Sequence, residues 1–137
     1  MTTMQLSYGK TRELDLDFSA TVARAKELLA QQGFGVLSEI DVAATLRAKL
    51  GADIGQYVIL GACKPDAAKH ALDADPDVGL LLPCNVIVRR SAGRTTVGVV
   101  DASAMLRLTG NAELASTAAD VDTRLIAVLD GIAGSKP

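Results

Sequence analysis

The sequence predicts an α+β fold in which one curved, mostly antiparallel sheet carries two long helices packed on one face. Strand-like and helical segments alternate along the chain. The turn Ser91-Ala92-Gly93 joins two β-branched runs, which indicates a hairpin and argues against a purely parallel sheet. Two long stretches, 19–32 and 112–132, carry apolar residues at helical spacing. The 137 residues fit one domain, expected over 1–133, before a disordered tail at 134–137.

The first third of the chain begins with residues 4–12, which alternate loosely and are expected to form an opening strand. Asp17 or Ser19 can cap the first long helix, and Gly33 supplies its left-handed end. Residues 34–40 then read as a strand, in which alternation puts Phe34, Val36 and Ile40 away from Glu39.

The middle of the chain predicts a short helix, a buried strand and a third helix. Asp41 is placed to cap residues 42–50, which end at Gly51. Residues 57–62 are strongly apolar and are expected to form a core strand. Pro65 suits a first helical turn, so a helix is expected to follow as far as Ala74.

The last third predicts the hairpin and the second long helix. Asp75-Pro76 ends the preceding helix, and a long strand is expected over 78–90. The partner strand is expected over 95–101, where Asp101 reads as a turn former. The helix over 112–132 completes the chain.

Composition points to self-association. Apolar residues make up 49% of the chain, yet there are only two Tyr, two Phe and no Trp. The mean hydropathy is positive, at +0.26. A small domain of this kind is expected to have more apolar surface than one copy can bury. A homodimer is the simplest way to bury the remaining apolar surface.

Charge and segment composition argue against two classes of partner. A net charge of −2 and four aromatic residues do not suit nucleic-acid binding. No apolar run reaches the roughly 18 residues needed to span a bilayer, so no membrane partner is expected. The N-terminal residues do not resemble a signal peptide, and two cysteines without an export signal indicate free thiols in the cytoplasm.

Cys63 stands at a strand-to-helix junction, just before Lys64-Pro65. The partial positive charge of a helix N-terminus favours the thiolate over the thiol, so a reactive cysteine is one interpretation. The other is a small buried residue that closes a strand, because free cysteine is among the most buried residue types.

Cys84 alternates with Leu80, Leu82 and Val86, which places it on the core face of the expected strand. Pro83 lacks an amide donor, so it implies a sheet edge, a bulge or a strand end beside the cysteine. A metal site is not expected, since the C-x-x-C spacing is absent and His70 is the only histidine. No cofactor motif stands out: Gly33-Phe34-Gly35 ends a helix, whereas phosphate binding needs glycines that open one.

Three segments resemble the domain of unknown function 302 family of small bacterial and archaeal proteins. They are GFGVLSEIDV at 33–42, the run from Tyr57 to Pro65 that contains ILGACKP, and LLPCNV at 81–86. The main departure is Lys64, where the family pattern often has Asn. The resemblance implies a fold similar to the TATA-binding-protein-like class and a dimer, and it implies no activity.

Two functions follow as hypotheses. In the first, the protein is a homodimeric module that binds an unidentified small molecule in an apolar space lined or bordered by Tyr57, Cys63, Cys84 and Asn85. In the second, it is a thiol-dependent enzyme or redox sensor with Cys63 as nucleophile and Cys84 as resolving partner. A purely structural role for both cysteines is the third interpretation.

Overall fold

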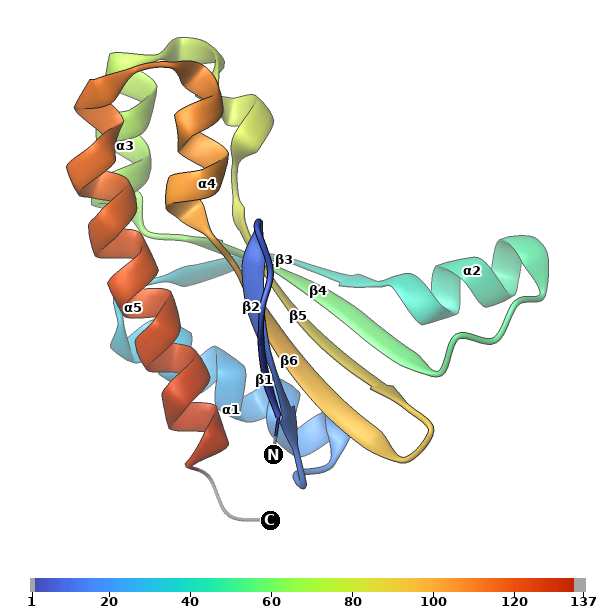
Figure 1. Cartoon of the computed structure of the whole chain (residues 1–137). Helices are drawn as coiled ribbons and strands as arrows, with labels where there is room; N and C mark the ends of the chain where they lie inside the picture. The colour runs from blue at the N-terminus through green and yellow to red at the C-terminus, as the bar shows by residue number, and fades with distance from the viewer. Residues whose placement is uncertain (1, 135–137) are drawn as a thin grey trace.

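The computed structural model describes residues 2–134 and contains one six-stranded sheet in the order β1-β2-β6-β5-β4-β3 (Figure 1). Every neighbouring pair of strands is antiparallel. The strands are β1 (Thr3–Gln5), β2 (Gly9–Leu14), β3 (Gly35–Asp41), β4 (Gln56–Cys63), β5 (Cys84–Ser91) and β6 (Arg94–Val100). The α-helices are α1 (Phe18–Gln31), α2 (Val42–Leu50), α3 (Pro65–Ala74), α4 (Ala102–Leu106) and α5 (Ala115–Ala133). Three 3-10 segments complete the described part: η1 (Pro76–Leu81), η2 (Arg107–Thr109) and η3 (Ala112–Leu114).

The core lies between one face of the sheet and the long helices α1 and α5, which confirms the predicted fold class (Figure 1). Alternate residues of the central strands, such as Leu60 on β4 and Val86 on β5, are fully buried on this face. Leu29 of α1 and Leu125 of α5 are equally buried opposite them. Aliphatic side chains therefore build the core, as the composition requires.

Aspartates fix where three helices begin. The Asp17 carboxylate accepts a hydrogen bond from the Ala20 amide at 2.7 Å, and Asp41 accepts one from Ala44 at 2.9 Å. Asp17 is therefore the cap of α1, and Ser19 lies inside the helix. Asp101 caps the short helix α4, which the sequence did not predict. Each cap satisfies an amide that has no partner within its own helix.

The expected opening strand is two strands. β1 and β2 form a hairpin, and the Leu6 amide donates to the Gly9 carbonyl at 2.7 Å across its turn. Only β2 pairs with β6, so β1 lies at the edge of the sheet.

The strand expected over 78–90 begins only at Cys84. Residues 76–81 form η1 instead, where the Asp75 carboxylate accepts a hydrogen bond from the Asp77 amide at 3.0 Å. This local bond competes with extended structure, and η1 still buries Val78 in the core. Pro83, which has no amide to donate, marks the end of the ladder, so Leu80 and Leu82 do not share a strand with Cys84.

The register of β3 shifts between Val36 and Ser38. Residues beyond the shift therefore face the opposite side of the sheet from the one that simple alternation predicts. Val36 lies opposite Ala62 on the core side, whereas Ile40 lies opposite Ile59 on the other face. The expectation that Val36 and Ile40 share a face was therefore wrong, because one extra residue in a strand reverses the facing beyond it.

The shift completes an isoleucine row on the face that α1 and α5 leave open. Ile40, Ile59 and Ile87 stand opposite one another on β3, β4 and β5. We refer to these three residues as the isoleucine row. Beside it, α2 projects from the body of the protein, and Ala43 is its one buried residue (Figure 1). Within residues 2–134, no helix is long and apolar enough to cross a membrane.

Candidate functional site

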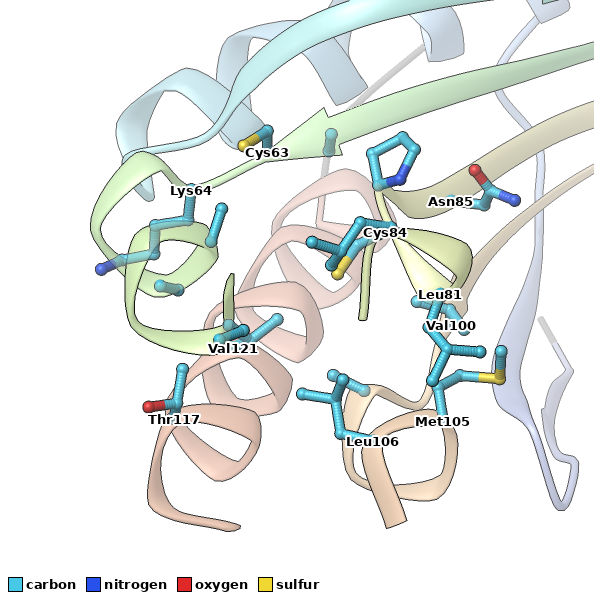
Figure 2. A pocket seen from close by; sticks show the side chains of 18 of the residues that line it. Cys63, Lys64, Leu81, Cys84, Asn85, Val100, Met105, Leu106, Thr117 and Val121 are labelled. Carbon is cyan, nitrogen blue, oxygen red and sulfur yellow. The ribbon is translucent and has the colours of Figure 1, made fainter. Parts of the chain in front are cut away.

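A cavity of about 500 Å³ opens at the end of the sheet where β4 stops and β5 starts. Figure 2 shows its lining side chains between α3, α4, α5 and the segment that leads into β5. Most of its wall is aliphatic, including Ala71 of α3, Leu81 of η1, Leu106 of α4 and Val121 of α5. A space of this size and character is typical of small-molecule sites.

Both cysteines line this cavity from adjacent strands. Cys84 stands opposite Ala62 and so shares the core face with it, as the sequence predicted. Cys63 follows Ala62 directly, so alternation turns its side chain to the other face of the sheet. Figure 2 shows the two side chains pointing in different directions. The structure therefore brings the two cysteines to one cavity without making them face each other.

Burial raises the pKa of the Cys84 thiol to about 11, and the nearby Asp122 carboxylate and Cys63 add to the shift. Desolvation and a neighbouring negative charge both disfavour the thiolate. Cys84 is therefore a neutral thiol at neutral pH, which suits a packed wall better than a nucleophile.

Lys64 is the charged residue of the wall, and its side chain is only 11% exposed. Its Nζ donates to both carboxylate oxygens of Asp66, at 2.7 and 2.8 Å, and lies 3.8 Å from Asp120. The hydrogen bond from Lys64 lowers the pKa of Asp66, which keeps this carboxylate charged. The ammonium group is thus neutralised at the margin of the cavity.

Asp122 of α5 joins α4 to the rest of the site. Its carboxylate accepts hydrogen bonds from the Ala102 amide at 2.6 Å, from the Ser103 amide at 3.1 Å and from the Ser103 hydroxyl at 2.6 Å. Asp122 was not among the site residues predicted from the sequence. The available signal was its position between Val121 and Leu125, at the border of the apolar helical face.

The other two predicted ligand-binding residues, Asn85 and Tyr57, lie apart from each other. Asn85 lines the cavity beside Cys84, whereas Tyr57 does not. Tyr57 lies six residues before Cys63, near the opposite end of β4, where it stands opposite Arg89. Wall residues such as Met105 and Thr117 were not foreseen, because they come from segments remote in sequence.

Among residues 2–134, no group of three or more histidine, cysteine or acidic side chains could hold a metal ion. His70 is exposed on α3, and its Nε2 lies 3.3 Å from the Glu113 carbonyl oxygen. It is not part of the cavity wall.

Comparison with protein families gives one match that spans most of the chain. Residues 10–132 match the model described as "Domain of unknown function DUF302". The chain belongs to the DUF302 family. A solved DUF302 structure, the uncharacterized conserved protein from Bacillus stearothermophilus, is 34% identical and superposes with a TM-score of 0.82. The match covers 88% of this chain and 94% of that one. A comparison with curated proteins finds no match.

Both cysteines lie inside the matched DUF302 region, as do Lys64 and Asp122. The family description and the name of the solved relative both leave the function open. Functional inference for this DUF302 protein therefore rests on its cavity and surfaces.

Proposed function

We propose that this protein is a homodimeric module that binds a small apolar molecule in the cavity beside Cys63 and Cys84. The observation that carries the proposal is the aliphatic cavity of about 500 Å³, set between the sheet end and three helices. Its few neutral polar groups, Cys84 and Asn85 among them, can orient a ligand, while the apolar wall supplies the affinity.

The proposal is tested by filling the cavity. Ala68 lines it from α3, so Ala68→Phe places a ring in the space while keeping a helix-compatible residue. The neutral fluorescent probe N-phenyl-1-naphthylamine is expected to bind the wild type and to bind Ala68→Phe at least about tenfold more weakly, because the ring occupies its volume. Fluorescence titration measures both dissociation constants.

The matched control is Ala127→Phe, which adds the same ring at an exposed position of α5 outside the cavity wall. It is expected to bind the probe like the wild type. Ala68→Leu, a smaller filler, should give an intermediate loss, and circular dichroism shows whether each variant is folded. Equal probe binding by folded Ala68→Phe and Ala127→Phe contradicts the proposal.

The isoleucine row supports the homodimer. Large aliphatic side chains in one row on an uncovered sheet face form an apolar strip that a second copy can bury. The expected molar mass in solution is twice 14.2 kDa.

A thiol-dependent enzyme or redox sensor remains the second candidate, and one observation favours it. Cys63 ends β4 directly before the N-cap of α3, and the side chain of the cap residue Lys64 does not accept a hydrogen bond from any backbone amide of the first turn. The amides of that first turn can therefore stabilise a nearby thiolate.

Iodoacetamide labelling, followed for each cysteine by mass spectrometry, separates the two candidates. The second candidate requires Cys63 to react in the native protein near neutral pH, and to do so in Cys84→Ser but not in Cys63→Ser. Cys84 is expected to react slowly in either case, because a pKa of about 11 leaves about one thiolate in a thousand at pH 8. If both thiols react only after denaturation, the enzyme candidate fails.

A further inference from the structure

We propose that the cavity accepts an uncharged, mainly hydrocarbon molecule and rejects its anionic analogue, because Asp66 and Asp120 withhold the Lys64 ammonium from any ligand. This inference rests on the proposed function and names the class of ligand.

The described part of the cavity wall offers a single positive charge to a ligand. Of the residues that line the cavity within the described range 2–134, only Lys64 carries a charge at neutral pH. A carboxylate, sulfonate or phosphate inside the cavity would need this ammonium as its counter-ion. Burial of an unpaired charge in an apolar site is strongly unfavourable.

Lys64 is already paired with two carboxylates. Asp66 receives two short hydrogen bonds from Nζ, and Asp120 lies at 3.8 Å. Asp120 also accepts a hydrogen bond from Arg124 at 3.1 Å, so two cations face two carboxylates and the cluster is neutral. An anionic ligand would have to break a charge-assisted pair whose cation is largely buried.

Asp122 adds negative charge beside Cys84, on the core side of the cavity. The Asp122 carboxylate lies near enough to Cys84 to contribute to its raised pKa. A ligand anion beside Cys84 would meet the same negative charge. Electrostatics therefore disfavour an anion on both sides of the space.

Neutral groups remain available to a ligand. Within the described residues, Asn85 and Thr117 line the cavity, and their side chains make no hydrogen bond to another residue. Its entrance is apolar, since Leu37, Leu72 and Leu80 belong to the wall and are 69%, 41% and 89% exposed. A hydrocarbon body with one neutral polar group suits this combination.

The experiment compares two probes that differ by one sulfonate: N-phenyl-1-naphthylamine, which is neutral, and 8-anilino-1-naphthalenesulfonate. The wild type is expected to bind the neutral probe at least about tenfold more tightly. Asp66→Asn removes the main partner of Lys64, so affinity for the sulfonate should rise about three- to tenfold while affinity for the neutral probe changes less than about twofold.

The matched control is Asp73→Asn on the same helix. Asp73 pairs with Lys69, which is 75% exposed and does not line the cavity. The control removes the same charge from α3, so it isolates the release of Lys64 from a change in net charge. Its affinity for the sulfonate should stay at the wild-type value.

The outcomes separate this inference from the proposed function. If the neutral probe does not bind in the cavity, both fail. If it binds and is displaced by filling at Ala68, but the sulfonate binds equally well, the binding module stands and the neutral-ligand inference is overturned. Equal changes in sulfonate binding by Asp66→Asn and Asp73→Asn would also overturn the neutral-ligand inference and leave the binding module standing.

Discussion

Replacing Asp122 with alanine is expected to lower the free energy of unfolding by about 2–4 kcal/mol. The side chain accepts three hydrogen bonds from the first turn of α4 and ties this helix to α5. Hydrogen bonds to a charged acceptor are stronger than neutral ones, and the variant leaves the Ala102 and Ser103 donors without it. Equilibrium unfolding in urea measures the loss.

The same variant has a second readout at the cavity. Asp122 contributes to the raised pKa of Cys84, so its removal should bring that pKa below about 11, although burial continues to hold it up. Native alkylation of Cys84 should therefore begin at lower pH than in the wild type.

Asp130→Ala is the control for Asp122→Ala. Asp130 lies on the same helix and pairs with Arg12, but its side chain is 55% exposed. Exposed ion pairs contribute roughly 0–1 kcal/mol, so its loss should be small. A destabilisation of Asp122→Ala no larger than that of Asp130→Ala would contradict the role given to Asp122.

Ile40→Lys is expected to weaken the proposed homodimer by at least about thirtyfold, because it places a charge within the isoleucine row. Ile40 is 49% exposed in the single chain, so the folded monomer should tolerate lysine. Sedimentation at a series of concentrations should show the mass falling toward 14.2 kDa in the variant while the wild type stays near twice that value.

Leu108→Lys makes the same kind of change at a residue that is 73% exposed on η2, away from the open face of the sheet. Its mass should match that of the wild type. A wild type of 14.2 kDa at every concentration, or equal dissociation of both variants, would reject the isoleucine row as the dimer surface.

The boundaries of α2 could be predicted from the sequence because they depend on local chemistry. Asp41 and Gly51 delimit α2 as expected, and Gly51 takes the left-handed conformation that ends the helix. The hairpin between β5 and β6 could also be predicted from its turn residues. Ala92 and Gly93 both adopt positive φ in this turn.

Features that depend on distant parts of the chain could not be predicted. The apolar run at 80–82 looks like a strand, but Val78 is buried as part of η1 and Pro83 ends the ladder. The bulge in β3 has no sequence signal of its own. The cavity lies beside both cysteines and Asn85, but its walls from α4 and α5 come from residues far along the chain, and sequence patterns do not show which distant segments meet.

The pairing of β2 with β6 has a consequence for how the protein is made. Gly9 stands opposite Val100, so β2 cannot find its partner until the chain has been synthesised as far as β6. The helix that seals the core, α5, leaves the ribosome later still. Contacts this distant in sequence form slowly and cannot be made in order of synthesis. The nascent chain must therefore carry its apolar strands uncovered until α5 has been synthesised.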